Sequence, residues 1–319
     1  AVSQAAWFAE QFDVALAEMK QALVLRPDWE VAAIYQGRIL ARTSEASALE
    51  FYEDYLKRYP KANDTRITYA RLLLAEKNYA KAREQFQRLL AENPGNADVA
   101  VAVGLLSMEL QDYEVAESNF KKALDLDYRD PGMVRFYLGG VYEKTNDIDT
   151  AMESYRSVTS GAQYIPAQVK YAILLSRKGK TDEAVHYLQG LPAANDQQQA
   201  QLIIAEAQLL REAKAYQKSY QLLSQGLEKL PDYPDLLYDR ALAAERIGKT
   251  ESMERDLRKL IQLKPDHAHA YNALGYGLAE HTNRLKEALE LIEKAIRLSP
   301  NDPYIMDSLG WVHYRLGNL

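Results

Sequence analysis

A period of about 34 residues runs through this sequence and limits its possible folds more than any other feature. Prolines mark the period where we expect a helix to end, because proline lacks the amide hydrogen that a helix interior needs. In two units Tyr128 and Gln163 take the equivalent place. The marker prolines are Pro27, Pro60, Pro94, Pro231, Pro265 and Pro300. A fixed period of this length is typical of arrays in which one helical unit stacks on the next.

Small residues recur at two fixed places within the period. At the first place a small residue precedes a large one by four positions, as in Ala82 with Phe86, Ala116 with Phe120, Ala151 with Tyr155, Ala184 with Leu188 and Ala288 with Ile292. The second place is occupied by Ala70, Gly104, Gly139, Ala172, Ala207 and Ala241. The pattern predicts paired helices whose backbones approach closely, with a small residue of one helix facing a large residue of its neighbour.

Departures from the pattern are few. Ser219 and Met253 stand where the other units carry alanine, so we expect looser helix pairs there. The unit around Gly37 is one residue short, and the segment 281–284 carries one extra residue between two helices. These departures predict altered loops and small changes in packing rather than a different fold.

Both ends of the sequence fall inside a repeat. Residues 12–26 have the pattern of a second helix, and residues 303–316 have the pattern of a first helix. No Gly-, Ser- or Pro-rich linker separates one half of the sequence from the other. We therefore expect residues 1–319 to form one array of about eight complete repeats with a partial repeat at each end, as part of a longer chain.

The repeat resembles the tetratricopeptide-repeat family. In that family a first helix carries a Leu-Gly pair, and a second helix carries alanine, an aromatic residue and alanine before a proline. One unit shows this in Leu138, Gly139, Tyr142, Ala151 and Tyr155, and another in Leu274, Gly275, Ala288, Ala295 and Pro300. The resemblance implies an all-α superhelical solenoid of antiparallel helix pairs that binds other proteins and has no catalytic role of its own.

Composition excludes several other functions. The 45 acidic and 39 basic residues are spread along the chain, so the basic stripe that nucleic-acid binding needs is absent. Without cysteine the chain cannot form disulfides or thiolate metal sites. His267 and His269 lie two positions apart, a spacing that does not bring two side chains to one helix face. Neither a nucleophile-elbow motif nor a phosphate-binding loop motif occurs, so we expect no catalytic residue, metal or cofactor.

Aromatic and polar residues gather at the inner-face positions of the late first helices. Exposed aromatic rings next to hydrogen-bonding groups are common anchors for an extended peptide. The predicted binding residues are Tyr238, Asp239, Asn272, Tyr276, Asp307, Trp311, Tyr314 and Arg315. A smaller predicted cluster in the middle of the chain consists of Arg135, Phe136 and Lys144. Packing of Trp311 and Tyr314 against a further helix is the alternative explanation for those two aromatic residues.

The carboxyl-terminal repeats have a narrower resemblance. Residues 270–276, 284–292 and 307–312 are similar to a group of large proteobacterial tetratricopeptide-repeat proteins, many of them outer-membrane lipoproteins. In pseudomonads this group includes the adaptor of a carboxyl-terminal processing protease. The resemblance implies a periplasmic adaptor, held at the outer membrane by a lipid upstream of Ala1, that delivers cell-wall hydrolases to the protease. The alternatives are an assembly scaffold for envelope polysaccharide or lipopolysaccharide machinery, and an enzyme domain outside residues 1–319.

Overall fold

The structure is a computed structural model and describes residues 12–318, which form eighteen α-helices and no strand. The helices are α2 (Phe12–Leu25), α3 (Glu30–Thr43), α4 (Glu45–Arg58), α5 (Asn63–Ala75), α6 (Tyr79–Glu92), α7 (Ala97–Glu109), α8 (Tyr113–Asp125), α9 (Pro131–Lys144), α10 (Ile148–Arg156), α11 (Tyr164–Arg177), α12 (Thr181–Gln189), α13 (Asp196–Glu212), α14 (Tyr216–Lys229), α15 (Pro234–Arg246), α16 (Thr250–Leu263), α17 (Ala268–His281), α18 (Leu285–Leu298) and α19 (Pro303–Leu316). The prediction of an all-α fold is confirmed.

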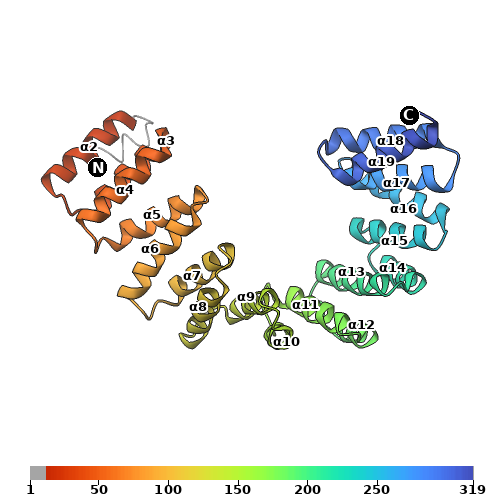
Figure 1. Cartoon of the computed structure of the whole chain (residues 1–319), viewed down its shortest axis with the longest axis horizontal. Helices are drawn as coiled ribbons and strands as arrows, with labels where there is room; N and C mark the ends of the chain where they lie inside the picture. The colour runs from red at the N-terminus through yellow and green to blue at the C-terminus, as the bar shows by residue number, and fades with distance from the viewer. Residues whose placement is uncertain (1–11, 319) are drawn as a thin grey trace. The chain divides into compact units, whose positions relative to one another are not determined.

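Successive helices from α3 to α18 form eight pairs, with α2 before them and α19 after them (Figure 1). Connections of only a few residues join the two helices of a pair, and a connection this short places neighbouring helices antiparallel. Every substantial helix contact within residues 12–318 joins helices that are adjacent or next but one along the chain. This local pattern of contacts is the defining property of a solenoid.

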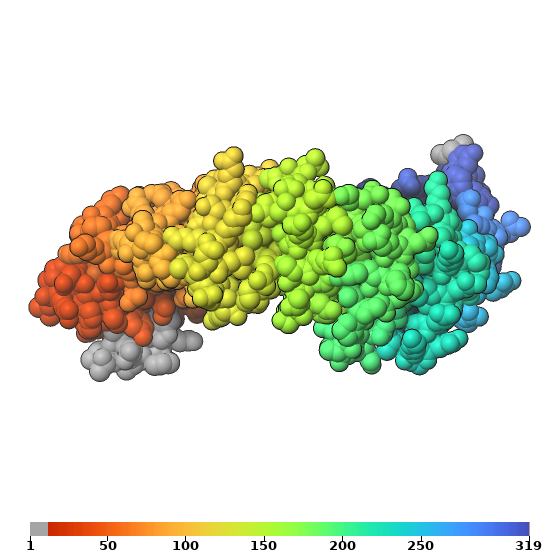
Figure 2. Space-filling view, turned by 90° about the horizontal axis from the view of Figure 1, so that it is seen from below, coloured from red at the N-terminus to blue at the C-terminus, as the bar shows by residue number. Residues whose placement is uncertain are grey.

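The chain divides into two compact units, Ala1–Gln163 and Tyr164–Leu319. In the first unit the colours of the space-filling view pass from red through orange to yellow in the order of the chain (Figure 2). The core of each unit is a series of layers between helices. In the second unit Leu223, Leu257 and Ile292, from α14, α16 and α18, are fully buried in one continuous cluster.

Small residues lie where two helices of a pair come closest, as the pattern predicts. A β-carbon added to Gly139 of α9 would lie 2.6 Å from the ring of Tyr155 on α10. The same distance separates a β-carbon added to Gly275 from the side chain of Ile292. The predicted alanines at both places in the period are fully buried, namely Ala70, Ala82, Ala116, Ala151, Ala172, Ala184, Ala207, Ala241 and Ala288.

The expectation of looser packing at Ser219 and Met253 is wrong. Ser219 is fully buried, and its hydroxyl donates a hydrogen bond of 3.1 Å to the carbonyl oxygen of Ala207. Met253 is 2% exposed because its side chain fits against Gly277, where an added β-carbon would approach its sulfur to 2.5 Å. The Ser219 hydroxyl thus bonds across its own helix pair, α13 and α14, whereas Met253 packs against α17 of the next repeat.

The connections differ from the simple pattern in two respects. In the short unit a single residue, Ser44, separates α3 from α4. Helix α10 ends at Arg156, although the repeat pattern places the end of this unit at Gln163. The residues that follow Arg156 are serine, valine, threonine, serine and glycine, which all have weak helix propensity.

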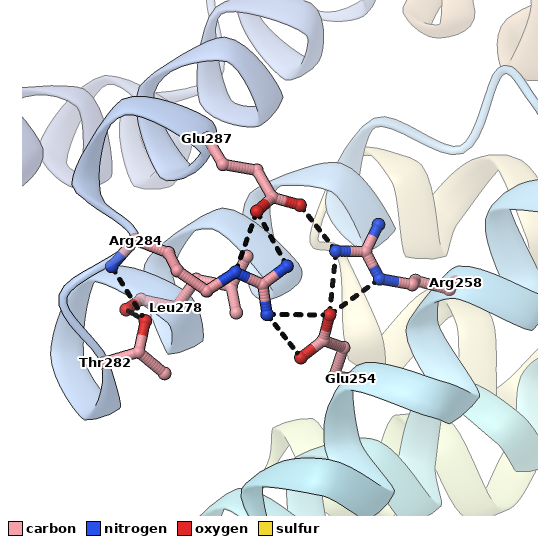
Figure 3. A network of polar contacts seen from close by, with 6 residues as sticks. All are labelled: Glu254, Arg258, Leu278, Thr282, Arg284 and Glu287. Carbon is pink, nitrogen blue, oxygen red and sulfur yellow. Dashed lines mark hydrogen bonds and ion pairs between the residues drawn. The ribbon is translucent and has the colours of Figure 1, made fainter.

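Charged side chains join α16 to α18 at one edge of the second unit (Figure 3). Arg258 of α16 and Arg284, which precedes α18, each contact both Glu254 and Glu287. Thr282 closes the turn before Arg284 by accepting a hydrogen bond of 3.1 Å from the Arg284 amide. The network therefore links the second helices of two successive repeats.

Candidate functional site

A groove lies between α17 and α19 on the surface of the second unit. It has a volume of about 580 Å³. We call it the C-terminal groove; its lining residues are Tyr276, Glu280, Met306, Asp307, Gly310, Trp311 and Tyr314. The structure thus brings together four of the residues predicted from the sequence, namely Tyr276, Asp307, Trp311 and Tyr314.

Aromatic rings form much of the groove. The rings of Trp311 and Tyr314 stack, with centroids 5.5 Å apart and planes at 27°. Tyr314 is 61% exposed, although side chains of this size are usually well buried in a folded protein. The indole nitrogen of Trp311 donates a hydrogen bond of 3.1 Å to the Glu280 carboxylate, which fixes the ring against α17. The two helices therefore present an aromatic surface that is already ordered.

Carboxylates supply the charge of the C-terminal groove. Glu280 and Asp307 both line it, and no basic side chain does. Arg315 lies beside the groove, where its guanidinium is 3.7 Å from Glu280 and 5.9 Å from the centroid of the Trp311 ring. Burial raises the pKa of Tyr276, and the carboxylate of Glu280 raises it further. Tyr276 is therefore a neutral hydroxyl at physiological pH.

Three other predicted residues make contacts outside the C-terminal groove. Tyr238 is half-buried and packs against His267, with ring centroids 5.4 Å apart. Asp239 is 9% exposed and forms an ion pair of 2.9 Å with Arg211 of α13, although burial raises its pKa. Asn272 is half-buried, and its buried side-chain oxygen lacks a hydrogen-bond partner within residues 12–318. Among these three residues, Asn272 is the one with a buried side-chain atom that lacks a hydrogen-bond partner in the described part of the chain.

The predicted cluster in the first unit is divided between two environments. Phe136 packs its ring against Tyr137 and Tyr155, at centroid distances of 5.7 Å in both cases. Arg135 instead lines a cavity of about 540 Å³ together with Arg129 and the loop residues Thr159, Ser160 and Gly161. The aromatic member of this cluster is half-buried among other rings, and the basic member lines a surface cavity.

A further cavity lies between α2 and α4, in residues that the sequence analysis did not select. Its volume is about 590 Å³. Phe51 and Tyr55 of α4, which lie one helical turn apart on the same face, form one wall together with Tyr59, the residue that ends the helix. Leu23 and Val24 of α2 lie opposite. The spacing of the three aromatic residues could have identified this surface from the sequence.

Residues 12–318 contain neither a metal-binding cluster nor a membrane-spanning helix. Among the described residues, no group of three or more histidine, aspartate or glutamate side chains is placed to hold a metal ion. Instead, His267 caps α17 through a hydrogen bond of 3.1 Å that its ring accepts from the Ala270 amide. Within the same part of the chain, none of the helices is both long and apolar enough to cross a membrane.

Comparison with known proteins identifies the repeat. Models of the tetratricopeptide repeat match residues 40–106, 102–165 and 238–303, which together make up more than half of the chain. The chain is 40% identical over 184 residues to the TPR repeat-containing protein PA4667 of Pseudomonas aeruginosa. This match covers 58% of the chain but only 31% of the relative, so the chain spans about a third of that protein.

Two solved structures have a similar fold. A tetratricopeptide repeat protein from Parabacteroides merdae matches with a TM-score of 0.53 and 14% identity, over 78% of this chain and 98% of that one. The carboxyl-terminal part of a TPR repeat-containing protein from Cytophaga hutchinsonii matches with a TM-score of 0.51 and 17% identity, over 76% of this chain and 99% of that one. Helix pairing, the spacing of small residues and these matches agree, and the chain belongs to the tetratricopeptide-repeat family.

Proposed function

We propose that this protein is a periplasmic adaptor that binds a carboxyl-terminal processing protease and presents cell-wall hydrolases to it. Tetratricopeptide-repeat proteins are protein-binding scaffolds, which is the broader function of the family. The observation that carries the proposal is the C-terminal groove, where Tyr276, Trp311 and Tyr314 lie exposed or half-buried beside one another. Ordered aromatic side chains in an open groove are typical anchors for a protein partner.

The protease is proposed from similarity. The groove lies within the same carboxyl-terminal repeats that are similar to the pseudomonad adaptor, and the 40% identical relative also comes from a pseudomonad. An adaptor of this kind raises the local concentration of the substrate at the protease without taking part in bond cleavage. Such a role needs binding surfaces and no catalytic residue.

The proposed location is the periplasmic face of the outer membrane, with the protein attached through a lipid outside residues 1–319. Reading the gene upstream of Ala1 for a signal peptide that ends in a lipid-attachment cysteine tests this location. Incorporation of labelled palmitate into the full-length protein is an independent test. A reading frame that lacks such a cysteine would contradict the anchor.

A double variant of the groove tests the proposal of an adaptor. Tyr276→Ala with Trp311→Ala should abolish capture of the carboxyl-terminal processing protease or its hydrolase substrates from the same organism, while helical content by circular dichroism stays unchanged. Tyr304→Ala is the matched control because Tyr304 is a 77% exposed aromatic residue of α19 that does not line the groove. Unchanged capture by the folded double variant would exclude the groove as the binding surface.

Crosslinking followed by identification of the bound proteins separates this proposal from the alternative. Recovery of the protease and cell-wall hydrolases supports the adaptor. Recovery of polysaccharide or lipopolysaccharide assembly proteins in their place would favour an assembly scaffold.

A further inference from the structure

The C-terminal groove has the composition of a site for a positively charged group. Three aromatic rings line it, and the face of an aromatic ring carries partial negative charge that attracts a cation. The stacked pair of Trp311 and Tyr314 offers such faces from α19, and Tyr276 adds a third ring from α17. Tryptophan is the residue whose ring attracts cations most strongly.

Carboxylates reinforce the attraction. Asp307 is exposed in the groove, and no ion pair to it forms within residues 12–318. Glu280 lies on the opposite helix, where the Trp311 indole and Arg315 occupy part of its hydrogen-bonding capacity. The charged groups that act on the Tyr276 hydroxyl are three carboxylates, of Glu280, Glu245 and Asp307, against the single guanidinium of Arg246.

The basic residue at the rim does not reverse this balance. Arg315 was predicted as a hydrogen-bond donor to a peptide, but its guanidinium lies 3.7 Å from Glu280 and is half-buried. Glu280 and Arg315 together are close to neutral, which leaves Asp307 as the uncompensated charge inside the groove. An acidic group entering here would meet a like charge, and an apolar group would remove Asp307 from water without a partner.

We propose that the C-terminal groove selects an extended peptide segment by a lysine or arginine side chain. The cation would lie against the rings of Tyr276, Trp311 and Tyr314, within reach of the Asp307 carboxylate. The inference rests on the proposed function, because it names the chemistry of the segment that the adaptor holds. It also implies that the groove does not accept a free carboxyl terminus.

Fluorine NMR of the protein labelled with fluorotryptophan tests the inference directly. The chain has three tryptophans, and the variant Trp311→Phe assigns the resonance from the groove. The probes are capped pentapeptides of glycine that carry lysine, arginine, norleucine or glutamate at the centre. An uncapped pentaglycine amide, which offers only an amino terminus, is the fifth probe.

The lysine and arginine peptides should shift the Trp311 resonance and bind at least about tenfold more tightly than the norleucine peptide. Asp307→Asn should reduce this preference several-fold. Asp266→Asn, which removes an exposed carboxylate outside the groove, should leave it unchanged. Equal binding of the lysine and norleucine peptides would overturn the inference. Stronger binding of the glutamate peptide would also overturn it, and so would a Trp311 shift that only the uncapped peptide produces.

The outcomes separate this inference from the proposed function. If Tyr276→Ala with Trp311→Ala abolishes capture of the protease or hydrolases while lysine and norleucine peptides bind alike, the adaptor stands and the cation preference fails. If the lysine peptide is preferred while the double variant still captures both partners, the groove recognises cations but does not serve the proposed adaptor role.

Discussion

One guanidinium nitrogen of Arg284 donates hydrogen bonds to both carboxylate oxygens of Glu254, at 2.9 and 2.8 Å, across thirty residues of sequence. The contact joins the turn before α18 to α16 of the preceding repeat (Figure 3). Arg258 and Glu287 complete the network, so each carboxylate has two guanidinium partners. Most stabilisation between repeats comes from apolar layers, and this network adds a charged link at their edge.

Arg284→Gln should lower the free energy of unfolding by about 0.5 to 1.5 kcal/mol at low salt, because the side chains of Arg284 and Glu254 are 43% and 24% exposed and water weakens their attraction. Urea unfolding at low salt and in 1 M salt measures the effect, which should shrink in salt. Arg297→Gln is the control, since Arg297 and Glu293 are 4.0 Å apart on one exposed helix face.

The same network predicts a dependence on pH. Burial raises the pKa of Glu254, but hydrogen bonds from Arg258 and Arg284 outweigh burial and lower it overall. The hydrogen bond from Arg258 likewise lowers the pKa of Glu287. A carboxylate with a lowered pKa stabilises the fold above its unfolded pKa and loses this effect as pH falls through the folded pKa. The loss of unfolding free energy caused by Arg284→Gln should therefore be largest near neutral pH and should become smaller in acid. A loss that does not change with pH would show that these two carboxylates do not stabilise the fold through the network.

Two adjacent glycines in α9 should respond differently to alanine. Gly139→Ala should destabilise the protein by about 1 to 3 kcal/mol, because the new β-carbon would lie 2.6 Å from the buried ring of Tyr155. Gly140→Ala should be neutral or stabilising by up to about 1 kcal/mol, since its nearest neighbour lies at 3.5 Å and alanine favours helix. Thermal and urea unfolding of both variants make the comparison, and equal effects would show that the helices can separate at Gly139.

Glu206 should make stability fall as pH rises. It is 4% exposed on α13, and burial raises its pKa to about 7, although a hydrogen bond from Gln189 opposes the shift. The pKa of Glu206 is therefore higher in the folded protein than in the unfolded chain. Glu206 favours folding most below about pH 4.5, and the protein loses stability as the pH rises from there to about 7. Glu206→Gln should therefore stabilise the protein by roughly 2 to 3 kcal/mol at pH 8 and little at pH 4.5.

Unfolding free energies at the two pH values test the assignment to Glu206. Glu228→Gln, at an exposed position on the adjacent helix α14, is the matched control and should change stability little at either pH. A Glu206→Gln variant that is no more stable at pH 8 would mean that the carboxylate is solvated in solution.

Lys77 adopts a left-handed backbone conformation, with φ of 57°, in the turn between α5 and α6. This conformation costs a residue with a β-carbon about 1 to 2 kcal/mol, and glycine avoids the cost but loses more entropy on folding. Lys77→Gly should therefore stabilise the protein by about 0.5 to 1 kcal/mol. Gln87→Gly, at an exposed position inside α6, should destabilise it by about 1 kcal/mol. If urea unfolding shows that both variants lose the same free energy of unfolding, the prediction is refuted.

The sequence by itself determined the helices and how they pair. The spacing of Gly139, Ala151 and Tyr155 is a local property of neighbouring helices, and contacts between neighbours are all that a repeat array requires. The pattern also placed α19 at residues 303–316, where the structure has Pro303–Leu316. These features could be predicted because backbone geometry and steric fit depend on residues only a few turns apart.

Only the tertiary structure decided which polar and aromatic residues remain available for a partner. Asp239 and Asp307 are both acidic residues of first helices, yet the first is paired with Arg211 and the second is exposed in the groove. The left-handed backbone conformation of Lys77 likewise cannot be inferred from its residue type. Availability depends on which side chain of the neighbouring helix lies opposite, and the repeat pattern fixes the position of that side chain but not its identity or charge.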